Sequence, residues 1–327
     1  MSPIPTLPLN DKRAIPAIGF GTGSALFGKD ATAYVVQAIE GGFTHIDTAQ
    51  VYKNEESVGE ALRQAFGEAA PAGGDRSDIE KQRLGRLVRD DIWVTTKYGG
   101  VIDAEEALDI SLNKLGLSYV DLYLIHWPHF APDILKTWSE LERAHANGKA
   151  KSIGVSNFSV DQLKLILEHG KVLPTVNQIP FHPYNYHEQA ELLEFANQHG
   201  IRIESYSGLT PITKLPGGPL DDVIERIARR LGPKVTPAQV LMSWIRAKGV
   251  VVVTTTSRKE RIQEYLSTFG LPPLTKDDVD AIDEAGKHPP SPERKAGCVM
   301  AQQETSWVTA TIVMALVLGA FYFSAHC

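Results

Sequence analysis

Hydrophobic and polar positions along this chain follow a repeating pattern. A short apolar, β-prone run is followed by one or two longer stretches with helical periodicity. The apolar runs predict eight strands, at 17–21, 43–47, 91–96, 120–125, 151–155, 175–178, 201–205 and 250–253. The periodic stretches predict helices at 30–40, 54–66, 103–115, 131–147, 160–168, 188–199, 220–231, 237–247, 259–267 and 276–285. At least one predicted helix therefore separates each strand from the next.

This alternation predicts an α/β fold in which parallel strands close into a (β/α)8 TIM barrel. The uniformly apolar run at 250–253, VVVV, suits a strand that is buried on both faces. We expect residues 1–287 to form the barrel domain, 288–304 a linker rich in proline and polar residues, and 305–325 a tail of different character. A polar stretch at 67–90 interrupts the repeat, and its composition predicts a loop insertion.

The tail carries no charged residue from 305 to 325, and 307–323 is almost entirely apolar. As a helix, that apolar segment spans about 26 Å, near the short limit for crossing a bilayer core. Trp307 and Tyr322 stand where interfacial aromatic residues are expected. We therefore predict a C-terminal single transmembrane helix that anchors a cytoplasmic barrel to an unidentified membrane. The alternative is a helix packed on the globular body.

The composition and charge of the chain argue against some classes of binding partner. The chain of 327 residues has a formal net charge of −6 and no block of basic residues, which argues against nucleic acid as a partner. Its two cysteines, Cys298 and Cys327, both lie after the predicted barrel domain, so neither a disulfide framework nor a cysteine metal cluster is expected in the barrel. The N-terminus has prolines and charges in place of the apolar core of a signal peptide, so no signal peptide is expected. We expect the barrel to be monomeric.

Polar residues follow the predicted strands, where a barrel of this type gathers its functional groups on one face. Four of them, on three successive turns, are Asp47, Tyr52, Lys97 and His126. A phenol titrates near pH 10, and a neighbouring ammonium group favours the phenolate and lowers that pKa. We therefore expect Lys97 to activate Tyr52 as a proton donor, Asp47 to hold Lys97, and His126 to orient a carbonyl oxygen or assist proton transfer.

Seven segments together resemble the aldo-keto reductase family: GFGTG (19–23), GFTHIDTAQVYKNEESVGEAL (42–62), TTK (95–97), LIHWP (124–128), IGVSNF (153–158), NQI (177–179) and ERIQEY (260–265). The resemblance covers residues 8–286. It implies NADPH-dependent reduction of an aldehyde or ketone, with Asp47, Tyr52, Lys97 and His126 as a catalytic tetrad.

The same resemblance implies a set of ligand-binding residues. Those for the cofactor are Thr22, Ser156, Asn157, Gln178, Tyr206, Ser207, Leu209, Thr255, Thr256, Arg261 and Glu264, and Trp127 is implied for the substrate pocket. Ser156, Asn157 and Gln178 would hold the nicotinamide carboxamide, and Tyr206 would stack on the ring.

The chain departs from the family pattern at two places. Many members have a tryptophan where this chain has Gly23, so an aromatic wall of the pocket is missing and bulkier substrates could enter. The common Pro-Lys-Ser after the last strand is replaced by residues 254–256, TTT, which removes a lysine expected at the 2′-phosphate of NADPH. Arg261 and Arg258 could hold that phosphate instead, so NADPH is preferred over NADH.

The sequence also contains a glycine pattern and a histidine pattern, and it leaves one alternative function open. The glycines of GFGTG do not fit G-x-G-x-x-G, which argues against a dinucleotide-binding turn. His129, His182 and His187 match no standard zinc spacing, and no metal is expected. The alternative function is an NADPH-binding regulatory subunit of a membrane protein, because potassium-channel β subunits resemble the same family.

Overall fold

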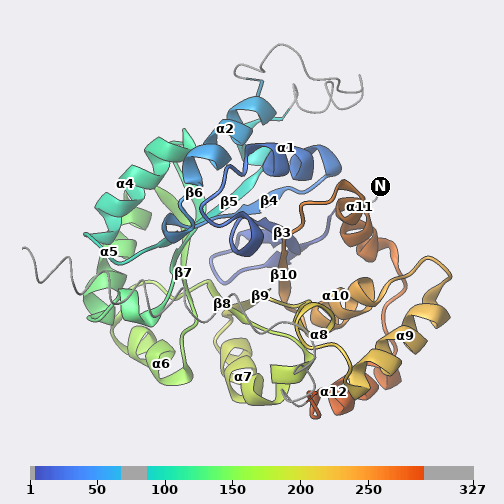
Figure 1. Ribbon diagram of the computed structural model, residues 1–327. Coiled ribbons are helices and arrows are strands. Elements are labelled where there is room, and N and C mark those ends of the chain that lie inside the picture. The colour runs from blue at the N-terminus through green and yellow to red at the C-terminus, as the bar shows by residue number, and fades with distance from the viewer. Residues whose placement is uncertain (1–3, 68–86, 291–327) are drawn as a thin grey trace, which may run out of the picture. The chain divides into compact units, whose positions relative to one another are not determined.

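Eight parallel strands form a closed barrel in the computed structural model, which describes residues 4–67 and 87–290 (Figure 1). Around the barrel the order is β10-β3-β4-β5-β6-β7-β8-β9. The strands are β3 Ile18–Gly21, β4 His45–Asp47, β5 Trp93–Tyr98, β6 Val120–Ile125, β7 Ala150–Ser156, β8 Val176–Pro180, β9 Arg202–Tyr206 and β10 Val251–Thr254. The predicted (β/α)8 barrel is confirmed, and every described element belongs to one unit, Met1–Pro289.

Helices surround this barrel on the outside (Figure 1). They are α1 Thr32–Gly41, α2 Glu55–Ala65, α4 Ala104–Leu115, α5 Ile134–Ala146, α6 Val160–His169, α7 Ala190–Gln198, α8 Thr210–Thr213, α9 Pro219–Leu231, α10 Pro237–Ala247, α11 Lys259–Ser267 and α12 Lys276–Gly286. All ten predicted helices are present. The one-turn helix α8 was not predicted, since four residues are too few to show a helical period.

Several helix ends follow the capping signals in the sequence. Asp103 accepts hydrogen bonds from the backbone N–H groups of Glu105 and Glu106 and so begins α4 as predicted. Ser159 and Thr236 form capping boxes with the glutamine three residues later, at the start of α6 and α10. These caps satisfy backbone donors that would otherwise be left without partners at each helix start.

A short N-terminal hairpin was not predicted. Strands β1 Thr6–Pro8 and β2 Ala14–Pro16 pair antiparallel to each other. Leu9 and Ile15 from the hairpin form a buried cluster with residues at the starts of barrel strands, including Trp93, Val176 and Val251. The hairpin therefore covers the N-terminal end of the barrel, opposite the end at which strands deliver their functional residues.

Two predicted segments lie largely or entirely outside the described residues. The insertion at 67–90 is described only at its two ends, and the tail at 305–325 not at all. Between residues 4 and 67 and between 87 and 290, no helix is both long and apolar enough to cross a membrane. The tail anchor therefore stays a prediction.

Candidate active site

A pocket of about 310 Å³ opens at the C-terminal ends of the barrel strands. Three of the four predicted catalytic residues line it: Asp47, Tyr52 and His126. Seven predicted cofactor residues also line it, namely Asn157, Gln178, Tyr206, Ser207, Leu209, Thr255 and Arg261, as does the predicted substrate residue, Trp127. The fold thus brings together residues that are spread over more than 200 positions of the sequence.

Asp47 and Lys97 form a buried ion pair at the base of this pocket. The Lys97 Nζ atom lies 2.6 Å from Asp47 Oδ1 and donates a second hydrogen bond to the backbone oxygen of Thr48 at 2.9 Å. The Lys97 side chain is fully buried. Burial lowers the pKa of Lys97, but Asp47, Tyr52 and Glu204 together raise it by more, so the net pKa lies above the usual value. Lys97 is therefore a fixed positive charge.

Tyr52 ends a short 3-10 helix, Gln50–Tyr52, directly after β4, and the left-handed backbone of Lys53 then starts the turn into α2. Its hydroxyl lies 3.5 Å from Lys97 Nζ, a long contact. Its ring meets the ring of His126 edge to face, with centroids 5.3 Å apart. The predicted tetrad is therefore assembled around one phenol.

The pKa of Tyr52 differs from the expectation drawn from the sequence. Burial raises the pKa of Tyr52 above its ordinary value of 10.0, and Lys97 lowers it, as predicted, but does not overcome burial. The carboxylates of Asp47 and Glu204 raise it further. In the protein without ligands, Tyr52 is therefore held as the neutral phenol, which is the form that donates a proton.

His126 is held in its neutral form. Burial lowers its pKa to about 2, and the Lys97 ammonium group acts in the same direction. Its Nδ1 atom has no hydrogen-bond partner within the described part of the chain. A neutral imidazole beside Tyr52 can orient a carbonyl oxygen by hydrogen bonding, whereas a role as proton donor from the imidazolium form is excluded at neutral pH.

The predicted nicotinamide-binding residues are joined by hydrogen bonds. The Tyr206 hydroxyl donates to Asn157 Oδ1 at 2.8 Å, and Asn157 Nδ2 donates to the backbone oxygen of His126 at 3.1 Å. Ser156 Oγ donates to the backbone oxygen of Gln178 at 2.8 Å. Asn157 has a φ of 63°, a left-handed conformation that asparagine tolerates better than most residues. These residues form one polar wall of the pocket.

Four predicted cofactor residues do not line this pocket. Thr22 is fully buried and donates to Thr48 Oγ1 at 2.9 Å, and Ser156 lies behind Asn157. Thr256 Oγ1 accepts from the backbone N–H of Arg258. Glu264 accepts from Thr236 Oγ1 at 2.7 Å and lines a neighbouring cavity with Arg261. Their cofactor roles stay predictions.

The sequence did not predict some of the residues that line the pocket. Thr213 and Lys214 line the pocket from α8 and the residue after it, in a loop region without any family motif. Tyr265 also lines it, and it closes the quoted motif ERIQEY. Glu204 is buried and linked to Asp47 through Gln178, and its only sequence signal was an acid within the predicted strand at 201–205.

The glycines of GFGTG make room for particular side chains. A Cβ atom on Gly19 would lie 2.8 Å from His45 Nδ1, one on Gly21 3.0 Å from Val253 Cγ1, and one on Gly23 2.9 Å from Tyr52 Cζ. Real Cβ contacts are rarely this short. Gly23 therefore packs directly against the phenol ring of Tyr52.

We expect Gly23→Ala to impair catalysis while leaving the fold intact. The backbone at Gly23, with φ −72° and ψ −158°, suits alanine, so the added methyl group acts mainly by displacing the Tyr52 ring. A misplacement of this size is expected to lower kcat/KM by about 10- to 100-fold. Gly270→Ala is the matched control, because its Cβ would meet no atom within 4 Å. Equal activity of the two variants would contradict the packing role.

Comparisons with known proteins agree with this geometry. The sequence profile of the aldo/keto reductase family matches residues 17–215. The chain is 35% identical over 284 residues to the NAD/NADP-dependent indole-3-acetaldehyde reductase of Schizosaccharomyces pombe, covering 83% of this chain and 92% of the relative. It is 34% identical over 288 residues to the glyoxal reductase of Bacillus subtilis, covering 86% and 93%.

A solved structure shows the same similarity. The Bombyx mori aldo-keto reductase in complex with NADP superposes with a TM-score of 0.74 and 31% identity, covering 87% of this chain and 94% of that one. The fold, the pocket and the sequence profile therefore point to the same family of enzymes.

Proposed function

This chain belongs to the aldo/keto reductase family, and from that premise we propose that it reduces an aldehyde or ketone to the alcohol with Tyr52 as general acid. It is an NAD(P)H-dependent oxidoreductase, and its substrate is a small carbonyl compound. The observation that carries the proposal is the position of Tyr52, whose hydroxyl lies 3.5 Å from the Lys97 ammonium group and whose ring packs edge to face against the His126 ring.

Each residue of the tetrad has its own role in the reaction. His126, in its neutral form, orients the carbonyl oxygen towards the Tyr52 hydroxyl. Tyr52 donates its proton as negative charge develops on that oxygen, and Lys97 stabilises the phenolate that remains. Asp47 keeps Lys97 charged and in place. The cofactor, when bound, supplies the hydride.

The pocket also fits a dinucleotide cofactor. Asn157, Gln178 and Tyr206 present amide and aromatic groups at the tetrad, where a nicotinamide would have to lie for reaction. The Thr255 hydroxyl is buried without a hydrogen-bond partner among the described residues and lies on the pocket wall, as expected for a group that awaits a ligand. Arg261 lines the same wall and offers a bidentate donor for a phosphate.

Spectrophotometric assay of NADPH consumption with a panel of aldehydes and ketones tests the proposal. Purified protein should oxidise NADPH only when a carbonyl compound is present, and the alcohol should be recovered as product. Absence of turnover across aliphatic, aromatic and dicarbonyl substrates would contradict it. The regulatory-subunit alternative gains no support from the relatives, which are named as reductases.

We also propose that residues 305–325 anchor a cytoplasmic barrel to a membrane. The support is the apolar segment 307–323, which carries no charged residue. Leu316→Arg places a charge near its centre, which disfavours insertion by roughly 2.5–3.5 kcal/mol, and it should shift the protein from the membrane pellet to the supernatant. Leu316→Ile is the control and should remain in the pellet. Equal distribution of the two variants would refute the anchor.

A further inference from the structure

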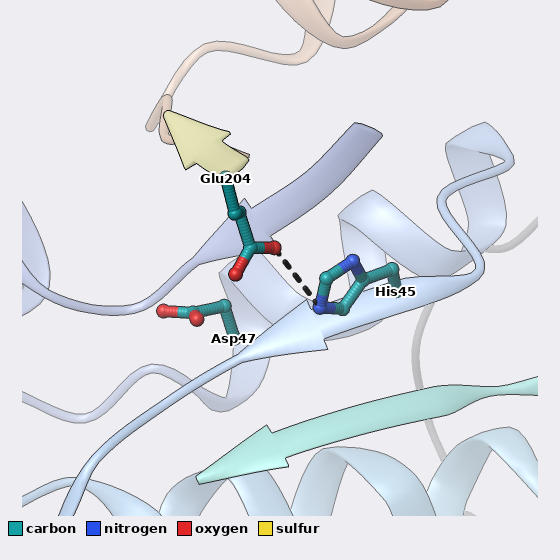
Figure 2. A group of neighbouring side chains, drawn as sticks. All are labelled: His45, Asp47 and Glu204. Atoms are coloured by element: carbon teal, nitrogen blue, oxygen red, sulfur yellow. Dashed lines mark ion pairs between the residues drawn. The ribbon is translucent and has the colours of Figure 1, made fainter. Parts of the chain in front are cut away.

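Glu204 is a second carboxyl group inside the barrel, directly below the catalytic tetrad. It lies on β9, two residues before Tyr206, and is fully buried. Figure 2 shows its carboxyl group between His45 and Asp47, with both neighbours on β4. Burial of a carboxylate is costly unless a cation or several hydrogen bonds compensate it. The surroundings of Glu204 therefore decide in which protonation state it exists.

Glu204 and Asp47 share one amide group. Gln178 Nε2 donates to Glu204 Oε2 at 2.7 Å and to Asp47 Oδ2 at 2.8 Å. An amide nitrogen has two hydrogens, so both are used. The strand register supports this arrangement, because Gln178 on β8 is the direct partner of Glu204 on β9. Glu204 is thus linked to the ion pair of Asp47 and Lys97 through a single side chain.

Among the described residues, no lysine or arginine contacts the Glu204 carboxyl group, and burial raises its pKa by more than the Lys97 ammonium group lowers it. Its Oε1 atom has no hydrogen-bond partner among the described residues, and His45 Nε2 lies 3.9 Å away while it contacts Thr95 Oγ1 at 3.0 Å. Burial lowers the pKa of His45 to about 3, so this imidazole is neutral. Lys97 is bound to Asp47 and Thr48. Burial and the Asp47 carboxylate raise the pKa of Glu204 to about 8.

The same three side chains, His45, Asp47 and Glu204, have ligand atoms close enough together to suggest a metal site. Both oxygens of Asp47 are engaged, one by Lys97 and one by Gln178. One oxygen of Glu204 is engaged as well. An ammonium group already supplies the positive charge at this position, and a second cation beside it would be repelled. The cluster is better explained by proton binding than by metal binding.

We propose that Glu204 is a positioning residue that holds a proton during catalysis, and that its ionisation makes Tyr52 release its proton less readily. This inference rests on the proposed role of Tyr52 as general acid. When Glu204 is neutral, Asp47 and Lys97 form a balanced pair beneath the phenol. When Glu204 loses its proton, a second negative charge adjoins that pair and opposes formation of the phenolate.

The effect of Glu204 on the pKa of Tyr52 depends on pH. Below about pH 8 Glu204 is neutral and Tyr52 is unaffected by it. Above that pH the new charge raises the pKa of Tyr52, so that Tyr52 titrates later than it would beside a neutral group. Replacing Glu204 by glutamine keeps the shape and removes the charge. The midpoint of Tyr52 should then fall by roughly one pH unit, as expected for a charge several ångströms away.

The test uses the full-length protein without cofactor. Tyrosinate absorbance is titrated in wild type and Glu204→Gln, and subtracting the matching Tyr52→Phe titrations isolates Tyr52. In parallel, the infrared C=O band of a protonated carboxyl group should be present in wild type, fade as the pH rises through about 8, and be absent in Glu204→Gln. Glu140→Gln is the matched control, because Glu140 is also buried but lies on α5, outside the barrel. It should leave Tyr52 unchanged.

Each outcome decides the inference. An unchanged Tyr52 midpoint in Glu204→Gln, or no band that fades near that pH, overturns it. If Glu204→Gln does not fold, Glu204→Met is used; failure of both neutral replacements to fold also overturns it, because a neutral acid should tolerate neutral substitutes of similar size. A shifted midpoint without any carbonyl turnover would reject the proposed function alone, whereas turnover without a shift would reject this inference alone.

Discussion

Tyr52→Phe is expected to reduce kcat/KM for carbonyl reduction by about 10²- to 10⁴-fold, the range typical of a lost general acid. The change removes one oxygen atom. Among the described residues, that hydroxyl has a single hydrogen-bond contact, a long one of 3.5 Å with Lys97 Nζ, so little stability should be lost with it. The effect should therefore appear in kcat, while cofactor affinity and the thermal midpoint stay close to wild type. Steady-state kinetics and fluorescence titration with NADPH measure the two quantities separately.

Tyr34→Phe is the matched control for this prediction. Tyr34 lies on α1, in the ring of helices outside the barrel, and does not line the pocket. It should keep wild-type kinetics. A Tyr52→Phe variant that retains more than about a tenth of the wild-type kcat/KM would be incompatible with general acid catalysis by this residue.

Lys97→Met is expected to be the most damaging single substitution in the site. The variant leaves the Asp47 carboxylate buried without its cation, since the Asp47 side chain is 3% exposed. Removing one partner of a buried ion pair typically costs about 3–5 kcal/mol. The free energy of unfolding in urea should fall by that amount, and activity should fall by at least about 10²-fold, because the Tyr52 phenolate loses its stabilising charge.

The double variant Asp47→Asn/Lys97→Met separates the two effects. It replaces both charges, so that no uncompensated carboxylate remains in the barrel at this position. Most of the lost stability should return, while activity should stay lost. A Lys97→Met variant as stable as wild type would show that Asp47 is not a buried carboxylate in need of a cation. Recovery of activity in the double variant would show that Lys97 has no catalytic role.

The barrel itself was predictable from the sequence. Strand and helix periods of 2 and 3.6 residues are local properties, so apolar runs and periodic stretches were enough to predict all eight barrel strands and ten helices. The hairpin of β1 and β2 was missed because three-residue strands are too short to show a period, and each contains a proline. Its contacts with the rest of the chain, among them the packing of Leu9 and Ile15 and the ion pair between Arg13 and Asp121, explain why it forms.

The meeting of the four tetrad residues was predictable for a similar reason. In a parallel barrel, residues that follow the strands meet on one face, so Asp47, Tyr52, Lys97 and His126 could be assigned to one site without coordinates. How these residues shift one another's pKa values was harder to predict from the sequence. The sequence predicted that Lys97 lowers the pKa of Tyr52, which is correct as a contribution, but burial outweighs it. Burial depends on the whole surrounding structure and is not encoded in any one motif.

By itself, then, the sequence determined the barrel, the order of its elements and the residues that meet at its mouth. The tertiary structure alone decided that Gly23 packs against Tyr52, and that Gln178 joins Glu204 to Asp47 inside the barrel. The physical reason is that these contacts depend on strand register and on the inward layering of side chains from different strands. Residues 47, 178 and 204 are far apart in the chain and become neighbours only when the barrel closes.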